Sequence, residues 1–498
     1  MTSSLRIIVL LILAAQSSCV LHSIQETTPS TPAAPAEGYA TLDKLPFHEG
    51  WYGMYFQEDK VGYSHFKIEP AGQNFNISTD SLMRLKAIKK ISEIGVKETV
   101  TVRPDLTMIS FESRMTMNDK TLETKGKTEG KRFAVQMQVE GEKLNREYPI
   151  DDALYHSSAI SLMPALKGLK EGETRSFPVF NSENQSIEKV EQSLASVKNA
   201  PGPNGAVWSA KNRLGRSTVQ SWLNKNGLTV LEKALDGSLI TILEDESSAK
   251  RFIEKKTADK DIVLDVSLIR VSNQIKDPEK IRFLKLKITG VSPALIPSDH
   301  RQTATLINKD APDEGFYVTV NIEDPQKIRT SQVPVPRPLL ADHLISTIGI
   351  QADHKEIVAQ SKKIVAPADS NLEKVRKLVR WTSENIKNEM KDSFTSVEVL
   401  RSREGECQSH ANLYTAFARS REIPTKVVTG LVYSERFSGF LYHAWAESHV
   451  DGWLAVDPTL KQIPADATHV KIAGNSDDYS STVLKMIGKI KIEVLEYK

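Results

Sequence analysis

Short runs in which apolar and polar residues alternate dominate the chain from about Leu45 to Asp342. They are rich in β-branched and aromatic residues and are separated by turn residues, which is typical of strands with one buried face. The clearest runs are 50–57, 62–68, 98–102, 133–139 and 218–223. Asn224 to Gly227 then predicts a hairpin turn that leads into 228–231. We therefore expect a large β-rich region that is mainly antiparallel.

Helical spacing interrupts the strands at least once and becomes dominant in the last third of the chain. The segment 158–169 has a helical pattern that ends at a glycine. After the proline-rich linker 333–338, Ser370 and Glu373 form a capping-box pair, and apolar residues recur at helical spacing over 372–386. This pattern predicts a helix of about five turns that opens the last domain. The fold class is therefore α+β.

The chain is too long for one ordinary core, because 498 residues correspond to several domains of usual size. We divide it into five parts: a signal peptide (1–18), a flexible tether (19–44), a β-rich domain (45–258), a second β-rich segment with the linker (259–345), and a C-terminal domain (346–498).

The N-terminus has the layout of a secretory signal peptide. Arg6 precedes the apolar run Ile7–Ala15, which is too short to cross a bilayer. The four residues that end at Cys19 resemble the lipobox of bacterial lipoproteins, although Gln16 replaces the usual leucine. Cleavage after Ser17 is the alternative, but an ordinary cleavage site needs no cysteine. We expect an exported protein that is anchored to the membrane by a lipid on Cys19.

The Thr-, Pro- and Ala-rich segment after Cys19 suits a tether between the anchor and a globular body. Val20 follows Cys19 in place of the aspartate of many lipoproteins retained at the inner membrane, so we expect the outer membrane. A soluble periplasmic or secreted protein is the alternative.

Charge and cysteine content exclude two classes of protein. The 65 basic residues nearly balance the 63 acidic ones and are scattered, so the field that holds nucleic acid is absent. With only two cysteines, Cys19 and Cys407, a disulfide framework is excluded. Exported proteins meet oxidising conditions, so a lone thiol in the folded part calls for an explanation. A catalytic role for this thiol is the first candidate explanation.

Cys407 stands at the start of a predicted helix that runs to about Arg421 and stops before Pro424. Its sulfur falls on the inward face of the first turn, as judged from the stripe continued by Ala411. We expect the positive end of the helix dipole to lower the pKa of the thiol and favour the nucleophilic thiolate. Taken alone, a buried structural cysteine explains the residue equally well.

His443 begins one predicted strand and Asp457 ends another. If the hairpin turns about Val450, each lies seven residues from the turn and the two are directly opposed. Asp457 would then hold one ring nitrogen as a donor, so that the other could accept the thiol proton and later deliver it to the leaving group. Singly, a core histidine and a turn aspartate are the commoner explanations. Together with Cys407 they predict a catalytic triad.

Five short motifs in this region resemble the transglutaminase-like superfamily, whose domains share a papain-type fold. They are Gly405-Glu406-Cys407, Ile423-Pro424, His443-Ala444-Trp445-Ala446-Glu447, Gly452-Trp453 and Asp457-Pro458-Thr459. The resemblance covers about 371–468, and 464–469 also looks like a stretch that follows Asp-Pro-Thr in bacterial members. The resemblance implies that Cys407, His443 and Asp457 are nucleophile, base and orienting carboxylate. Because members include cross-linkers, peptidases, amidases and some without the nucleophile, it leaves the substrate open.

The function expected from this resemblance is cysteine-dependent acyl transfer on peptide or protein amides in the cell envelope. A thioester at Cys407 would be resolved by water or by an amine, without metal or cofactor. The backbone N–H of Cys407 is an expected oxyanion donor, while the second donor and the oligomeric state stay open.

Two other readings compete with catalysis by a triad. One is a non-catalytic binding or structural lipoprotein that uses the same scaffold. The other is a zinc site built from Cys407, His410, His443 and His449, which the single thiol disfavours, because structural zinc usually takes paired ligands. In the triad reading His410 is expected to face outward.

Overall fold

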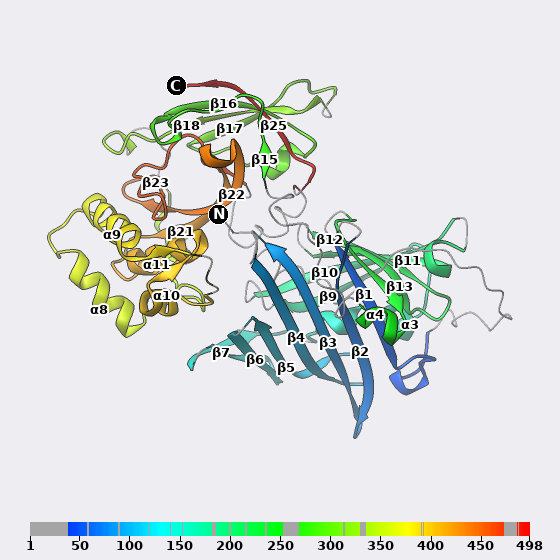
Figure 1. Cartoon of the computed structure of the whole chain (residues 1–498). Helices are drawn as coiled ribbons and strands as arrows, with labels where there is room; N and C mark the ends of the chain where they lie inside the picture. The colour runs from blue at the N-terminus through cyan, green and yellow to red at the C-terminus, as the bar shows by residue number, and fades with distance from the viewer. Residues whose placement is uncertain are drawn as a thin grey trace. The chain divides into compact units, whose positions relative to one another are not determined.

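The computed structural model describes residues 38–498 (Figure 1). Left out within that range are 57–58, 88–89, 119, 140, 152, 182–185, 199–200, 215–216, 235–236, 252–267, 312–313, 329–334, 390, 392, 473–485 and 487. The signal peptide 1–18, Cys19 and most of the tether 19–44 therefore lie outside the described residues. In the described part of the chain, no helix is long and apolar enough to cross a membrane.

The described residues belong to two compact units, one up to Arg251 and one from Leu268. The first is a sheet of fourteen strands in the order β8-β7-β6-β5-β4-β3-β2-β1-β14-β13-β12-β11-β10-β9. Neighbours in the sheet are mostly neighbours in sequence joined by antiparallel hairpins, and the pairing of β1 with β14 connects the two halves. The strands are β1 (Glu49–Phe56), β2 (Asp59–Ala71), β3 (Asn74–Ala87), β4 (Lys90–Val102), β5 (Met108–Met117), β6 (Lys120–Glu129), β7 (Arg132–Val139), β8 (Glu142–Pro149), β9 (Thr174–Asn181), β10 (Ser186–Ser196), β11 (Trp208–Leu214), β12 (Ser217–Leu223), β13 (Thr229–Ala234) and β14 (Leu239–Glu244).

Alternation along these strands confirms the predicted β-rich region. In β7, Phe133, Val135, Met137 and Val139 are buried while the residues between them are not. The predicted hairpin between β12 and β13 is also present, because the Asn224 side chain accepts the N–H groups of residues 226 and 228. The short helices of this unit are η1 (Leu42–Lys44), α2 (Ser157–Ile160), α3 (Met163–Lys167), η2 (Pro203–Gly205) and α4 (Glu246–Lys250).

The chain is already packed at the end of the segment assigned to the tether. The N–H of Tyr39 donates to the carbonyl of Ala165 at 3.0 Å, and Leu42 has no exposed surface. Leu45 is 3% exposed and continues this contact with the core. Residues 39–45 therefore belong to the β-rich unit.

The second unit holds two sheets. One has the order β17-β18-β16-β25 and consists of β16 (Phe283–Thr289), β17 (Gln302–Leu306), β18 (Phe316–Asn321) and β25 (Lys491–Tyr497). Its last strand comes from the C-terminal end of the chain and pairs with β16, with Ile288 opposite Ile492. Here β25 completes the buried face that Leu284, Leu286 and Ile288 begin, so strand 491–497 joins the sheet built from 283–321 and not the sheet of the triad.

The other sheet has the order β15-β22-β21-β24, and β23 pairs with β22. Its strands are β15 (Ile269–Arg270), β21 (Thr425–Ser434), β22 (Gly439–His449), β23 (Trp453–Val456) and β24 (Val470–Lys471). Helices gather beside β21 and β22 (Figure 1): α8 (Lys355–Ile364), α9 (Asn371–Asn385), α10 (Ser396–Ser402) and α11 (Cys407–Arg419). The smaller elements of this unit are α7 (Arg337–Ala341), β19 (Lys387–Asn388), β20 (Glu404–Gly405) and the 3-10 turns η4 (Pro278–Lys280), η5 (Pro293–Leu295), η7 (Asp342–Leu344) and η8 (Glu435–Phe437).

The capping box that begins α9 is confirmed: Ser370 accepts from the N–H of Glu373, whose side chain accepts from the N–H of Ser370. The helix is shorter than the five turns expected, because Ile386 is extended and ends it after Asn385. It also does not come first, since α8 precedes it.

Buried charges connect the β16–β18 sheet to the segment 455–471. Arg301, 2% exposed, pairs with Glu323 at 2.6 Å and donates to the carbonyls of residues 465 and 466. Lys471, 4% exposed, contacts both Asp299 and Glu447. Burial would lower the pKa of Lys471, but the two carboxylates outweigh it and raise the pKa, so the side chain stays charged.

We predict that Lys471→Met lowers the free energy of unfolding of the C-terminal unit by about 3 kcal/mol or more, because it leaves Glu447 and Asp299 as buried charges short of a partner. Lys461→Met is the control. Lys461 pairs with Glu384 at the surface, where both side chains are about half exposed, so its loss should cost less than about 1 kcal/mol. Denaturant unfolding followed by tryptophan fluorescence measures both, and equal effects would contradict the structural role of Lys471.

In the first unit, Glu232 on β13 is a buried carboxyl group that is 1% exposed. The Ser221 hydroxyl donates to its Oε2, while its Oε1 has no hydrogen-bond partner within the described residues. Burial raises the pKa of Glu232 well above its ordinary value, and the hydrogen bond from Ser221 offsets this only in part. The folded chain therefore favours the protonated, neutral form.

A raised carboxyl pKa makes a contribution to stability that is complete below the unfolded pKa of about 4.5 and is lost as pH rises through the folded pKa. We predict that Glu232→Gln, which keeps the shape without the charge, reduces the loss of thermal stability between pH 5 and pH 8. Calorimetry of wild type and variant at both pH values measures this. Parallel pH dependence of the two midpoints would show that Glu232 is not the group responsible.

Candidate active site

Helix α11 begins at Cys407, as predicted, and Glu406 is its N-cap. The Glu406 carboxylate accepts the N–H groups of Gln408 at 2.8 Å and Ser409 at 3.1 Å, and it lies 3.4 Å from the Cys407 sulfur. The first donors of the helix therefore point at a carboxylate beside the thiol. Sequence reasoning missed this cap, because glutamate is not among the preferred N-cap residues.

The Cys407 side chain has no exposed surface. It packs in a small cluster with Ala411 of the same helix and with Val427 and Ala444 of the sheet, and Ile350 lies against this cluster. The sulfur therefore lies under cover where α11 meets β21 and β22.

The position of His443 on β22 corrects the register expected for the hairpin. Strands β22 and β23 pair with His449 opposite Trp453, and Asp451, with φ of 70°, lies at the centre of the turn. The turn is one residue later than expected, so Asp457 follows β23 in line with Trp445 and not with His443. Residues two apart on a strand share a face, so the carboxylate still reaches the imidazole.

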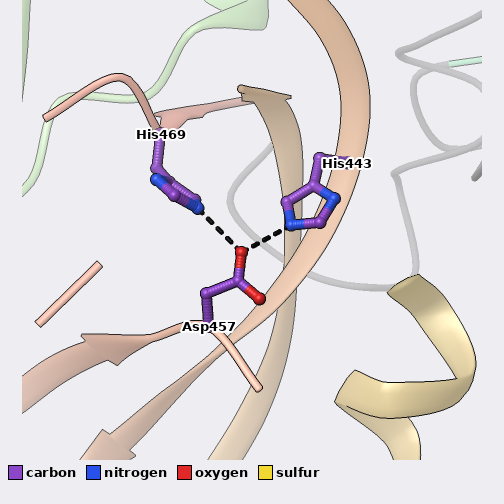
Figure 2. Close-up of side chains that lie close together, drawn as sticks. All are labelled: His443, Asp457 and His469. Carbon is purple, nitrogen blue, oxygen red and sulfur yellow. Dashed lines mark hydrogen bonds and ion pairs between the residues drawn. The ribbon is translucent and has the colours of Figure 1, made fainter. Parts of the chain in front are cut away.

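The Asp457 carboxylate is fully buried and accepts four hydrogen bonds. Its Oδ1 accepts the backbone N–H groups of Thr459 at 2.7 Å and Leu460 at 2.9 Å, as in an Asx turn. Its Oδ2 lies 2.6 Å from Nε2 of His443 and 3.0 Å from Nε2 of His469 (Figure 2). Both oxygens are thus saturated, and the carboxylate has one orientation.

These contacts set the charge states of the pair. Burial would lower the pKa of His443, but the Asp457 carboxylate and the Cys407 sulfur outweigh it and raise the pKa to about 9. Burial would raise the pKa of Asp457, but His443 and His469 hold it well below its usual range. With Nε2 bonded to Asp457, the Nδ1 of His443 is the ring nitrogen left for the sulfur.

His469 is a fully buried member of the site that sequence reasoning did not assign. Its Nδ1 lies 3.2 Å from Oδ1 of Asp466, opposite the bond to Asp457. Burial would lower the pKa of His469, but Asp466 and Asp457 raise it to about 9. The only clue in the sequence was the likeness of 464–469 to bacterial members of the family.

The other candidate residues are engaged elsewhere. His410 is buried, contrary to expectation, with its ring nitrogens 3.0 Å from the carbonyl of Glu406 and 3.1 Å from that of Ile386. The ring of His449 lies edge-on to the ring of Trp453. Neither side chain is directed at the sulfur by these contacts, which removes support for the zinc site proposed from Cys407 and His410.

Among the described residues, His443, Asp457 and His469 are the group whose ligand atoms, all within 4.8 Å of one another, could hold a metal ion. The facing atoms are already joined by the two hydrogen bonds to Asp457 (Figure 2). Each bond needs a proton on the nitrogen that a metal would occupy. The geometry therefore fits a hydrogen-bonded network better than a metal centre.

Comparison with solved structures finds distant similarities. A protein from Cytophaga hutchinsonii described as a "putative cysteine protease" is 16% identical over 44% of this chain and 86% of its own, with a TM-score of 0.28. A "beta-barrel-like protein" from Brucella abortus is 10% identical over 40% of this chain and 95% of its own, with a TM-score of 0.31. A "putative protease" from Parabacteroides distasonis is 11% identical over 77% of this chain and 70% of its own, with a TM-score of 0.19.

No curated protein matches the sequence significantly. The model of the transglutaminase-like superfamily matches residues 358–458, a segment that contains Cys407, His443 and Asp457 but ends before Asp466 and His469. This match agrees with the motifs and with the α+β arrangement of α8–α11 on β21–β23. The chain therefore carries a transglutaminase-like domain at residues 358–458.

Proposed function

We propose that the protein catalyses acyl transfer from peptide or protein amides through a thioester at Cys407. The observation that carries this proposal is His443, which is bonded to Asp457 at 2.6 Å through one nitrogen and interacts with the Cys407 sulfur. A nucleophile, a base and a carboxylate that orients the base are the parts that such a reaction needs.

The three residues divide the reaction as follows. His443, whose pKa is raised to about 9, holds the proton that Cys407 gives up, and the sulfur attacks the amide carbonyl carbon. The C–N bond of the resulting tetrahedral intermediate breaks, and the leaving amine takes the proton from His443, which leaves a thioester. Water or an amine then attacks the thioester carbonyl carbon and gives a proton to His443. The C–S bond breaks, the acyl group leaves as an acid or a new amide, and the proton on His443 is shared again with the released Cys407 sulfur. Asp457 keeps the ring oriented and stabilises its protonated form.

Substrate reaches the sulfur in this proposal after its cover moves. Cys407 has no exposed surface, and Ile350, which is only partly buried, packs against its cluster. The segment around Ile350 is tied down by the carbonyl of Gly349, which accepts from both the N–H and the hydroxyl of Ser396. We infer that this segment is the part of the cover that moves, because two other members of the cluster, Val427 and Ala444, lie on strands of the sheet.

The class of reaction can be decided by incubating the purified protein with bacterial envelope extracts. Mass spectrometry would score new cleavage products against new isopeptide links, with Cys407→Ser as the control. Cleavage products indicate that water resolves the thioester, and isopeptide links indicate an amine. If neither depends on Cys407, the chain uses the scaffold for binding or structure, which is the competing proposal.

Substitutions of the triad residues should reduce the rate by different amounts, according to the role of each residue. We predict that His443→Ala removes nearly all turnover, because His443 moves the proton, and that Asp457→Asn lowers kcat by about a thousandfold or more by favouring the wrong tautomer. The double variant should lose little more than His443→Ala alone, since the two act as a unit. A near-normal rate for Asp457→Asn in steady-state assays, with an unchanged thermal midpoint, would contradict the triad.

We also propose that the protein is a lipoprotein of the cell envelope, held at the outer membrane through Cys19, and that its substrates are envelope peptides or proteins. The support is the signal-peptide layout of 1–18 and the tether that follows. A soluble periplasmic or secreted protein is the alternative location.

For the anchor, we predict that the wild type expressed in a bacterium partitions into detergent and carries acyl groups on Cys19, whereas Cys19→Ala stays in the aqueous phase. Mass spectrometry of the mature N-terminus measures the modification directly. An unmodified N-terminus at Ser18 would favour the secreted alternative. Activity in the two proteins should be equal, because Cys19 lies outside the matched domain.

A further inference from the structure

We propose that His469 is a positioning residue of the active site, a permanent cation that fixes the shared oxygen of Asp457 and limits the hold of that carboxylate on His443. The proposal rests on the function proposed above for Cys407, His443 and Asp457. His469 lies beyond the segment that the family model matches.

The charge of His469 follows from its neighbours. Its Nε2 faces Oδ2 of Asp457 at 3.0 Å, and its Nδ1 faces the side chain and the backbone carbonyl of Asp466, each at 3.2 Å. Asp457 and Asp466 are held ionised, and carboxylate and carbonyl oxygens can only accept hydrogen bonds. Both ring nitrogens must therefore carry a proton, which makes the ring an imidazolium.

His469 is itself held firmly from the side away from Asp457. Asp466 accepts from the N–H and the hydroxyl of Thr468 at 2.8 and 2.6 Å and from the amide of Gln462 at 2.7 Å. The backbones of Gln462 and Asp457 exchange two hydrogen bonds of 3.0 Å. Hydrogen bonds within the loop from 457 to 469 thus hold it together, and Arg301 donates to its carbonyls at 465 and 466.

For catalysis, the important point is that one oxygen of Asp457, Oδ2, accepts hydrogen bonds from two imidazole rings. The rings of His443 and His469 are 5.7 Å apart, centroid to centroid, and Trp445 lies edge-on to His469 at 5.2 Å. The charged groups in contact with His469 are Asp457 and Asp466, and the Arg301 guanidinium binds the carbonyls of residues 465 and 466 in the same loop. A fixed positive charge at this distance opposes protonation of His443 and so eases return of its proton to the leaving amine.

Two substitutions separate the hydrogen bond from the charge. The amide nitrogen of Gln can stand where Nε2 of histidine stands, so His469→Gln keeps a donor to Asp457. The amide nitrogen of Asn can stand where Nδ1 stands, so His469→Asn keeps only the donor to Asp466. Both remove the charge. His449→Gln, a second histidine on the strand of His443 but outside the network, is the matched control.

The first measurement is an NMR titration of His443 in the full-length protein labelled on histidine, with the signal assigned by its loss in His443→Gln. Removing the charge should raise the pKa of His443 by about one unit in both His469 variants, and His449→Gln should leave it unchanged. A purely structural role for His469 predicts no such shift. Unchanged titration of His443 in both variants would overturn the proposal.

The second measurement is turnover of an envelope peptide found by the extract experiment. His469→Asn should lower kcat about tenfold or more with little change in KM, the loss expected when a hydrogen bond to a charged group is removed, whereas His469→Gln should stay within about threefold of wild type. Equal losses in the two variants at matched thermal midpoints would overturn the positioning role. If the wild type turns over no amide, the proposed function fails, and the titration alone decides the role of His469.

Discussion

The arrangement of the site depends on one buried carboxylate, that of Asp457. Four N–H donors saturate it, two from the backbone of residues 459 and 460 and two from the rings of His443 and His469. Burying a charge is costly unless it is paired and fully hydrogen-bonded, so the surrounding loop must hold each donor in place. Rotation of the carboxylate would break at least two of these bonds. The loop therefore fixes the orientation of the His443 ring.

Support for that loop comes from a distant part of the sequence. Arg301, Gln302 and Glu323 lie on or beside β17 and β18, yet they contact residues 455, 465, 466 and 471 around the site. Strand β25, from the end of the chain, completes the same sheet. The loop that follows Asp457 therefore rests on a sheet whose strands precede and follow the matched segment.

Cys407, the proposed nucleophile, is held in a different way from His443, the proposed base. His443 and Asp457 are fixed by specific hydrogen bonds, whereas Cys407 is held by the cap of Glu406 and by apolar packing. Apolar contacts such as that of Ile350 have no required direction and can be exchanged for contacts with a substrate. In the proposed reaction, a rigid base beside a nucleophile under a displaceable cover combines orientation with exclusion of water.

The sequence by itself determined the pieces of the structure that depend on local pattern. Alternation predicted the antiparallel sheet, Ser370 and Glu373 predicted the start of α9, and the motifs around Cys407, His443 and Asp457 predicted the domain. The predicted register was wrong, but the expectation that His443 and Asp457 share a face was right. The turn lies one residue later than expected, so the residue opposite Asp457 changes by two positions, and residues two apart on a strand share a face. Only the tertiary structure decided that His469, Asp466 and Arg301 meet at this carboxylate. Residues 301 and 465 are 164 positions apart, and no local periodicity relates them, so their contact follows from the packing of the β17–β18 sheet against the loop that follows Asp457.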